Sequence, residues 1–329
     1  MSNSTILFIT GNRLGDAVLT TGVLEHVLGL RPEAKVTVAC GPLPAPLFAD
    51  LGGLERIIPI VRRQGRSLAH WIELWKQVGQ RRWTDVIDLR SAFFWRLLRA
   101  DHRWHCRAEK RHEHRVAELA RQLELDRIPA PAIHVSPDRQ SRLDRLITGD
   151  RPILAVGPTA NWGGKQWPAD RFAEVVRHLA APGGILAGAR IAVFGAEHER
   201  QAAAAVLAAT PDPLDCIGMA DLLDLFALLR RCSFYIGNDS GLMHMAAAAG
   251  IPTLGLFGPS AEWRYHPWGP NGAVVRTPES LQQLTSAPDY DYRSHRSLML
   301  GLTVPAVIEA AEQLWARTAN PTAESHATP

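Results

Sequence analysis

The segment Phe234-Tyr235-Ile236-Gly237-Asn238-Asp239-Ser240-Gly241-Leu242-Met243-His244 is the most informative part of this 329-residue chain. A short run with strand chemistry leads into a polar turn with two glycines, and apolar residues at helical spacing follow over 242–249. A second apolar run occupies 253–257. This strand-helix-strand order predicts a parallel sheet covered by helices.

The same alternation recurs on both sides of this segment. Strands are expected at 6–10, 35–40, 56–60, 84–89, 153–157 and 190–194, and helices at 17–30, 68–80, 171–179, 197–208, 221–231 and 304–317. Residues 90–125 read as arginine-rich helices, and a proline-rich extended segment and one short helix follow. The chain is too long for one core, so we predict two Rossmann-like, doubly wound α/β domains, 1–150 and 151–318, with a disordered tail over 319–329.

Composition places the chain among folded globular proteins, with 46% hydrophobic and 21% charged residues. No secretory signal pattern and no run of 18 uncharged apolar residues is present, so a cytoplasmic protein is expected. Four cysteines without CxxC spacing favour buried thiols over a zinc site or disulfides.

Charge is divided unevenly between the two halves. Residues 1–150 hold 23 basic and 17 acidic residues, whereas the remainder holds 13 and 16. The halves therefore carry about +6 and −3, and the positive half is expected to meet an anionic partner.

Three polar loops follow predicted strands and precede predicted helices. The first is Gly11-Asn12-Arg13-Leu14-Gly15-Asp16, which matches neither the dinucleotide GxGxxG pattern nor a P-loop. Asp16 has two interpretations, a helix N-cap or a general base that removes a proton from an acceptor hydroxyl.

The second loop is Gly157-Pro158-Thr159-Ala160-Asn161-Trp162-Gly163-Gly164-Lys165-Gln166-Trp167-Pro168. Thr159 and Asn161 can donate hydrogen bonds to phosphate, and Lys165 can place a positive charge against a pyrophosphate leaving group. The alternative for Lys165 is a solvated surface lysine.

The third loop is the turn within the opening segment. Ser240 and Gly241 would present backbone N–H groups at a helix start, where phosphates bind, and Asp239 could bind sugar hydroxyls. His244 lies one helical turn beyond Ser240. The alternative is an N-cap with a core histidine whose hydrogen bonds are satisfied. Three such loops together favour a cleft that binds a nucleotide sugar.

These motifs resemble glycosyltransferase family 9, the ADP-heptose:lipopolysaccharide heptosyltransferases and their relatives. The resemblance rests on Leu14-Gly15-Asp16-Ala17-Val18-Leu19-Thr20-Thr21, on Lys165-Gln166-Trp167-Pro168, and on the third loop followed by Gly255-Leu256-Phe257-Gly258-Pro259. It spans residues 5 to 315 and implies a GT-B fold whose two domains face each other across a cleft. The first domain would bind the acceptor and the second the nucleotide.

The resemblance also implies roles for individual residues. Asp16 would be the base of an inverting transfer, beside an acceptor-side loop of Asn12, Arg13 and Gly15, and Lys165 would counter charge on the departing nucleotide. The donor pocket would be lined by Thr159, Asn161, Glu199, Met219, Asp239, Ser240, Gly241 and His244. The expected substrates are ADP-heptose and an anionic lipid-linked or oligosaccharide acceptor of lipopolysaccharide type, with no cofactor required and metal dependence left open.

One departure from the family concerns residues 288–295, where relatives often carry a cysteine and this chain has none. Another donor or acceptor within the family therefore stays open. A GT-B-type nucleotide-sugar epimerase is a second alternative, and a scaffold without turnover is disfavoured by the presence of Asp16 and Lys165.

A basic tract between Arg96 and Arg115 holds seven basic and three acidic residues. Its His112-Glu113-His114 spacing cannot place both imidazoles on one helix face, so a solvated or anion-facing helix is expected and no metal site is predicted. No nucleic-acid-binding module is recognisable. Peripheral membrane contact is expected through basic residues with Phe93, Phe94 and Trp95.

Overall fold

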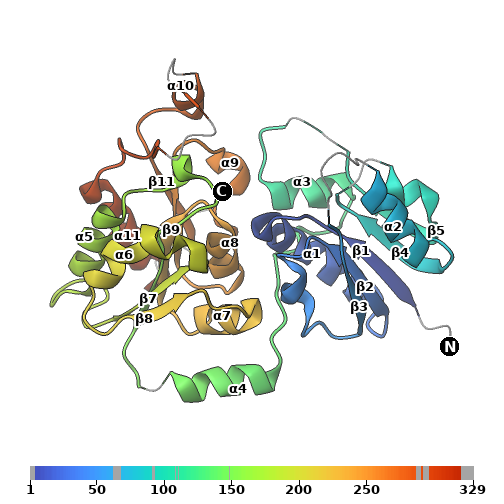
Figure 1. The fold of residues 1–329 in the computed structure, drawn as a ribbon, viewed down its shortest axis with the longest axis horizontal. Helices are drawn as coiled ribbons and strands as arrows, with labels where there is room; N and C mark the ends of the chain where they lie inside the picture. The colour runs from blue at the N-terminus through green and yellow to red at the C-terminus, as the bar shows by residue number, and fades with distance from the viewer. Residues whose placement is uncertain are drawn as a thin grey trace, which may run out of the picture. The chain divides into compact units, whose positions relative to one another are not determined.

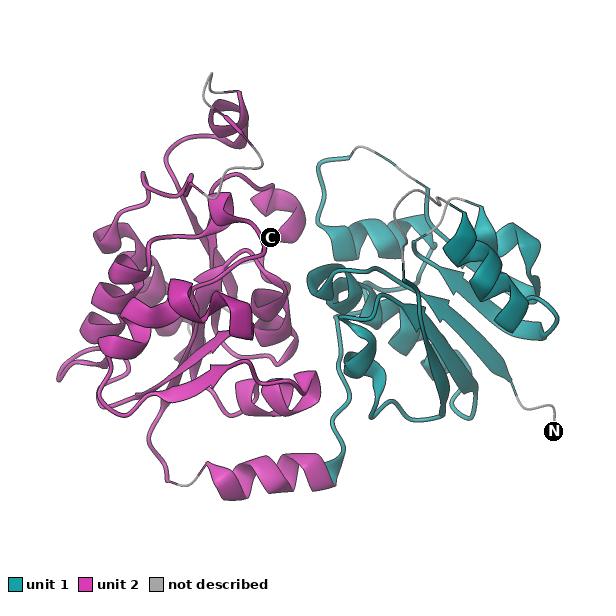
Figure 2. Cartoon of the chain, viewed as in Figure 1, with its two compact units in different colours: residues 1–137 teal, residues 138–329 magenta. Residues whose placement is uncertain are grey.

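The structure, a computed structural model, describes residues 4–61, 68–90, 93–107, 109, 111–147, 149–286, 290–291 and 296–319. The chain divides into two compact units, residues 1–137 and 138–329 (Figure 2). Helix α4 (Pro137–Leu146) belongs almost entirely to the second unit because Arg139 forms ion pairs with Asp221 and Asp224, at 2.7 and 2.5 Å. The division therefore falls before residue 150.

Unit 1 is built on a five-stranded parallel sheet in the order β3-β2-β1-β4-β5 (Figure 1). Its strands are β1 (Thr5–Ile9), β2 (Lys35–Cys40), β3 (Leu54–Pro59), β4 (Arg82–Asp88) and β5 (Arg99–His105). The central strand β1 has no exposed surface over Ile6 to Ile9, as expected for a strand with both faces covered.

Helices cover both faces of this sheet (Figure 1). They are α1 (Leu14–Leu30), α2 (Ala69–Val78), α3 (Arg115–Gln122) and the 3₁₀ turns η1 (Ala45–Phe48) and η2 (Phe94–Leu97). Leu74 and Val78 of α2 join Leu7 and Ile9 of β1 in one buried cluster, while α1 and α3 pack against each other. Successive strand residues point to opposite faces, so the two helix layers share the central strand between them.

Strand β5 corrects part of the prediction of arginine-rich helices over 90–125, whereas α3 lies within that range as a helix. It pairs in parallel with β4, with Asp85 opposite His102 and Asp88 opposite His105. It is the edge strand, and its residues are exposed or half-buried. An edge strand carries charged side chains without an apolar alternation, so its sequence lacks the usual strand signal.

Unit 2 is built on a six-stranded parallel sheet in the order β11-β10-β9-β6-β7-β8. Its strands are β6 (Ile153–Gly157), β7 (Arg190–Gly195), β8 (Leu214–Ile217), β9 (Phe234–Asn238), β10 (Thr253–Phe257) and β11 (Gly272–Arg276). Strands β8 and β11 were not predicted, and both are edge strands.

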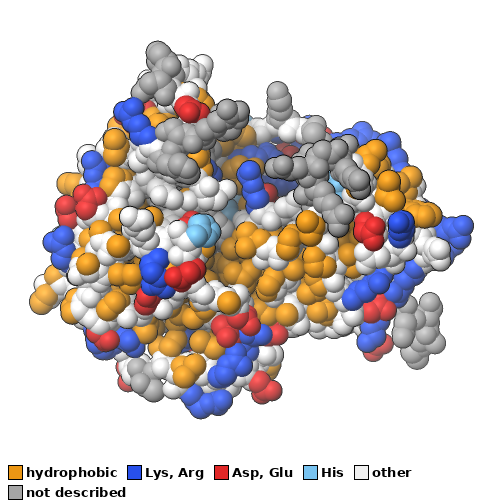
Figure 3. Space-filling view, viewed as in Figure 1, with side chains coloured by type: hydrophobic (Ala, Val, Ile, Leu, Met, Phe, Trp, Pro, Cys, Tyr) orange, Lys and Arg blue, Asp and Glu red, His pale blue; other side chains and the backbone are white. Residues whose placement is uncertain are grey.

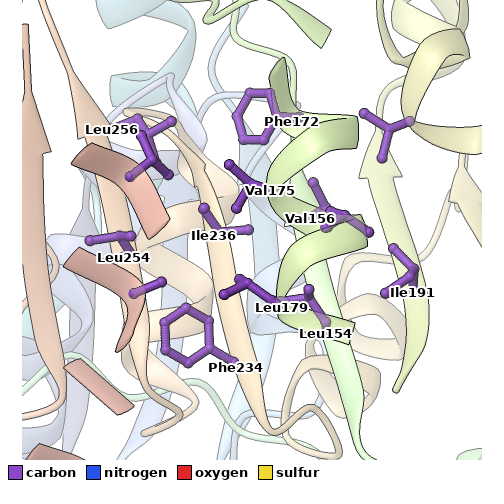
Figure 4. Packing of buried hydrophobic residues seen from close by; sticks show 14 of the residues in the cluster. Leu154, Val156, Phe172, Val175, Leu179, Ile191, Phe234, Ile236, Leu254 and Leu256 are labelled. Carbon is purple, nitrogen blue, oxygen red and sulfur yellow. The ribbon is translucent and has the colours of Figure 1, made fainter. Parts of the chain in front are cut away.

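The helices of unit 2 also lie on both faces of its sheet (Figure 1). They are α5 (Ala169–Ala180), α6 (Arg200–Ala208), α7 (Leu222–Leu229), α8 (Gly241–Ala248), α9 (Glu262–Tyr265), α10 (Leu281–Thr285) and α11 (Val304–Ala319), with the turns η3 (Gly163–Lys165) and η4 (Glu197–Glu199). Figure 4 shows Phe172, Val175 and Leu179 of α5 packed on Leu154 and Ile236 of the sheet.

The predicted elements otherwise match the structure closely. Strands 35–40, 153–157 and 253–257 have the observed bounds, and the predicted helix 197–208 begins as a 3₁₀ turn before becoming α6. Of the tail predicted from 319, Ala319 ends α11 and the rest lies outside the described residues.

Candidate active site

The polar loops of unit 2 converge where the order of its sheet reverses. Strands β6 and β9 are neighbours, with Gly157 opposite Gly237, yet the chain leaves β6 toward β7 and leaves β9 toward β10. Ligands of open parallel sheets bind beyond the carboxyl ends of the strands at such a switch point. The predicted second and third loops both begin here.

An ion pair joins these two loops. Lys165 Nζ donates to Asp239 Oδ2 at 2.5 Å, and the lysine side chain is only 25% exposed and the carboxylate 6%. The alternative of a solvated lysine is therefore wrong. The pair fixes the Lys165 ammonium group, beside the Asp239 carboxylate, at the carboxyl ends of β6 and β9.

The buried side-chain amide of Asn238 also stabilises the Lys165 loop. Asn238, with no exposed surface, donates from Nδ2 to the Pro158 carbonyl at 2.8 Å and accepts from the Trp167 backbone N–H at 3.1 Å. The sequence alone indicates no role for Asn238. An amide at the end of an otherwise apolar strand was the available signal.

A segment from the end of the chain also fixes the Lys165 loop. Leu298 donates its backbone N–H to the Gly164 carbonyl, and Ser297 Oγ donates to the Gln166 carbonyl. Trp167 Nε1 donates to the Leu302 carbonyl at 3.0 Å. The loop is thus held on both sides by hydrogen bonds that the sequence did not reveal.

Glu199 and Thr159 form a second polar pair beside the first. Thr159 Oγ1 donates to Glu199 Oε2 at 2.8 Å, and the Ala196 backbone N–H donates to the same oxygen. Met219 lies half-buried just after β8, and Asn161 is exposed. The strand-end loops after β6, β7 and β8 thus carry the predicted Thr159, Asn161, Glu199 and Met219.

The start of α8 provides backbone donors at this edge. Ser240 is the N-cap residue, with an extended backbone, and its side chain makes no capping hydrogen bond. Gly241 begins the helix. The first N–H groups of a helix are unpaired within it and lie at its positive end, which suits an anionic ligand.

His244 is buried within α8, with 5% of its surface exposed. Burial lowers the pKa of its imidazole to about 4, Asp239 opposes this shift, and Lys165 and His266 add to it. Its Nδ1 has no hydrogen-bond partner among the described residues, so the alternative of a satisfied core histidine is wrong. The ring is neutral at pH 7 and keeps one nitrogen available.

In unit 1, the loop after β1 places Asp16 in the first turn of α1. The N-cap is Arg13 rather than Asp16, so the N-cap interpretation of Asp16 is wrong. The Asp16 carboxylate is exposed, and so are Asn12 and Arg13, while Gly15 is half-buried. A negative side chain in the first turn still interacts favourably with the helix.

A hollow of about 350 Å³ lies in the same unit, between the end of β3 and α2. Ile58, Ile60, His70, Glu73 and Leu74 are among its lining residues. Its lining is a mixture of polar and apolar groups, unlike the mainly apolar lining of most ligand pockets. No motif in the sequence points to this region.

The basic tract has a different structure from the predicted one. Residues 99–105 are strand β5, and His114 is the N-cap of α3, where its Nδ1 accepts from the Val116 backbone N–H at 3.1 Å. Phe94 is fully buried, which excludes it from the predicted membrane contact, whereas Phe93 is 38% exposed. No group of three or more metal-binding side chains occurs among the described residues.

Two doubly wound units with polar loops at their strand ends have the architecture of the GT-B fold. The profile of glycosyltransferase family 9 (heptosyltransferase) matches residues 95–290. The chain is 24% identical to the lipooligosaccharide heptosyltransferase 2 of Haemophilus influenzae over 350 residues, covering 95% of this chain and 99% of that protein. This chain therefore belongs to glycosyltransferase family 9.

Solved structures share the fold. The family 9 glycosyl transferase of Veillonella parvula has a TM-score of 0.75 at 20% identity, with 95% of this chain and 98% of that one covered. The E. coli heptosyltransferase WaaC with ADP has a TM-score of 0.68 at 19% identity, with 94% and 99% covered. The predicted family and GT-B fold are confirmed. None of the described helices has the length and hydropathy needed to cross a membrane.

Proposed function

We propose that this enzyme transfers heptose from ADP-heptose to a hydroxyl of a lipopolysaccharide-type acceptor, with inversion at the sugar carbon. The observation that carries the proposal is the Lys165–Asp239 pair at the start of α8, where a positive charge and unpaired helix N–H groups meet. This combination suits the diphosphate of a nucleotide sugar. A related heptosyltransferase has been solved with ADP, which supports the choice of nucleotide.

On the donor side, Lys165 counters the negative charge that develops on the departing ADP. Asn161, Ser240, Gly241 and His244 bind the phosphates, and Thr159, whose hydroxyl donates to Glu199, lines the same pocket. Asp239 holds Lys165 in place and binds sugar hydroxyls. Glu199 accepts hydrogen bonds from the ribose hydroxyls, and Met219 contacts the base beside it.

In the reaction, the Asp16 carboxylate takes the proton of the acceptor hydroxyl as that oxygen attacks the anomeric carbon. The bond between this carbon and the diphosphate oxygen breaks, and its electron pair leaves with ADP. One displacement inverts the configuration. The exposure of Asp16 supports this role, because the carboxylate is open to a substrate. Asn12, Arg13 and Gly15 would contact the acceptor.

The acceptor is proposed to be anionic and linked to a lipid or an oligosaccharide. Within residues 1–137 there are 20 basic and 14 acidic residues, so unit 1 carries a net charge of about +6. Figure 3 shows basic and apolar side chains exposed together on the side of this unit in view. Peripheral membrane contact would use the basic residues with the exposed Phe93 and the half-buried Trp95.

A thermal-shift screen of the full chain tests the donor assignment. A ligand that binds only the native state raises its apparent stability by RT ln(1 + [L]/Kd), so ADP and ADP-heptose should raise Tm. A response confined to UDP- or GDP-sugars would contradict the choice of ADP and favour another donor within the family.

Product analysis with radiolabelled ADP-heptose and a lipopolysaccharide core acceptor tests the reaction. Label in the acceptor, with ADP released in equal amount, is the expected result. Label found only in an isomerised nucleotide sugar would overturn transfer and favour an epimerase. The anomeric configuration of the product, read by NMR, decides between inversion and retention.

A further inference from the structure

Three glycines lie in one row across the middle of the unit 2 sheet. Gly157 on β6 is opposite Gly237 on β9, and Gly237 is opposite Gly255 on β10. A Cβ at Gly157 or Gly237 would overlap the hydroxyl oxygen of Tyr235. The two glycines therefore make room for this hydroxyl, at the ends of the strands that carry the Lys165 and Ser240 loops.

Tyr235 is fully buried, and its hydroxyl has no hydrogen-bond partner among the described residues. The same holds for Ser240 Oγ, one residue before α8. Burial raises the pKa of Tyr235, with opposing influence from the neighbouring Ser240 hydroxyl and a smaller contribution from Asp239. The phenol is therefore protonated at neutral pH and available as a donor.

Such a hydroxyl lowers the stability of the fold. A buried donor without a partner loses its hydrogen bonds to water and gains none in return. Phenylalanine would fill the same space without that loss. Buried unpaired groups are uncommon in folded proteins, and a site that uses them is one explanation for their presence.

We propose that Tyr235 is a positioning residue for the donor diphosphate. When the diphosphate binds, the Tyr235 O–H donates to Ser240 Oγ, and Ser240 in turn donates its own proton to a phosphate oxygen at the start of α8. Hydrogen bonds linked in this way polarise and strengthen one another. The inference rests on the proposed function, because it needs a phosphate beside Ser240.

Tyr235→Phe in the full chain tests the role, because it removes one oxygen and preserves the ring. We expect the variant to bind ADP about three- to tenfold more weakly, the usual effect of one neutral hydrogen bond. Without ligand its Tm should rise by about 1–4 °C, since a buried unpaired donor is gone. A purely structural tyrosine would not shift Tm and affinity in opposing directions.

A double-mutant cycle tests whether Tyr235 acts through Ser240. Isothermal titration with ADP compares wild type, Tyr235→Phe, Ser240→Ala and the double variant. Tyr235→Phe should have no further effect once the serine hydroxyl is absent. Tyr265→Phe, which removes a hydroxyl that accepts from Arg264 Nε at 3.3 Å, is the matched control and should bind ADP as wild type does.

Two outcomes overturn this inference. One is an ADP affinity of Tyr235→Phe within twofold of wild type. The other is that Tyr235→Phe weakens ADP binding in the Ser240→Ala background by the same factor as in the wild-type background. Failure of the wild-type protein to bind ADP would instead contradict the proposed function. The two failures are thus distinguishable within one set of titrations.

Discussion

Lys165 and Asp239 are 74 positions apart in the sequence, yet their side chains meet at 2.5 Å and join the loops after β6 and β9. The carboxylate is nearly enclosed, whereas a quarter of the lysine side chain is exposed. If the loops separated, the Lys165 ammonium or the Asp239 carboxylate would lose its partner or become exposed to solvent. The pair therefore fixes the position of the two loops relative to each other in the absence of a ligand.

Removal of Lys165 should destabilise the fold as well as the donor site. Lys165→Met leaves the enclosed Asp239 carboxylate unpaired, with an expected loss of about 1–3 kcal/mol, less than for a fully buried pair because the lysine is partly exposed. The double variant Lys165→Met/Asp239→Asn should recover much of that stability in urea unfolding. Lys76→Met, at an exposed lysine, is the control. A double variant less stable than Lys165→Met would contradict the predicted coupling.

Asp16→Asn should lower turnover at least about 100-fold, as loss of a general base does, while ADP binding stays at the wild-type value. Its free energy of unfolding should change by less than about 1 kcal/mol, since the side chain is exposed and contributes only in the first helical turn. Asp170→Asn alters the matching first turn of α5 and should retain activity. Near-normal turnover of Asp16→Asn would reject Asp16 as the base.

Glu199 should discriminate between ribose and deoxyribose. Wild type is expected to bind 2′-deoxy-ADP about tenfold more weakly than ADP, because a carboxylate acceptor loses its donor. Glu199→Ala should bind both nucleotides with similar, weak affinity in calorimetric titrations. Continued discrimination by the variant would assign ribose recognition to another group.

The neutral His244 predicts a loss of stability in acid. Its folded pKa of about 4 lies below the ordinary value of 6.5, so the unfolded chain binds more protons between these two pH values. Its contribution to stability is thus complete above pH 6.5 and declines as the pH falls toward 4. Between pH 6.5 and 4, the Tm of His244→Gln should drop less than the Tm of wild type. The control His178→Gln, at an exposed histidine, should show the same drop as wild type. Equal slopes for His244→Gln and wild type would contradict the buried neutral ring.

Gly157→Ala should destabilise unit 2 by about 1–3 kcal/mol, because the new methyl group would overlap the Tyr235 hydroxyl. Adding Tyr235→Phe removes the nearest atom and leaves the ring carbon at 3.0 Å, so part of the stability should return. Denaturant unfolding of the single and double variants measures both effects. A double variant no more stable than Gly157→Ala would show that another contact limits the space.

The buried strands could be predicted from the sequence because their apolar runs are continuous, as in β1 and β6. Strand β5 could not, since its exposed Arg99, Asp101 and Arg103 are typical of helices and loops as well. The half-buried β11 and the short β8 carry equally weak signals. Position at a sheet edge is a property of the assembled fold, and it leaves little trace in the local pattern.

The sequence also predicts one part of the candidate site, the grouping of its loops, but not the contacts of the buried residues beneath them. The loops around Thr159, Lys165 and Ser240 follow recognisable strands, so their grouping at one edge could be expected from topology. The roles of Asn238 and Tyr235 depend on partners distant in sequence, such as the Pro158 carbonyl and the space above Gly157. Such contacts follow from strand register, which a single sequence does not specify.

The hydrogen bonds from residues 297–302 to the Lys165 loop have a consequence for biosynthesis. Leu302 accepts from Trp167 across 135 positions, so a nascent chain that has just completed β9 and α8 still lacks this support. The loop acquires these partners only after residues 297–302 have been synthesised. If the proposed function holds, a nascent chain that ends before residue 297 would therefore lack a fixed Lys165 loop and would not compete for the sugar donor.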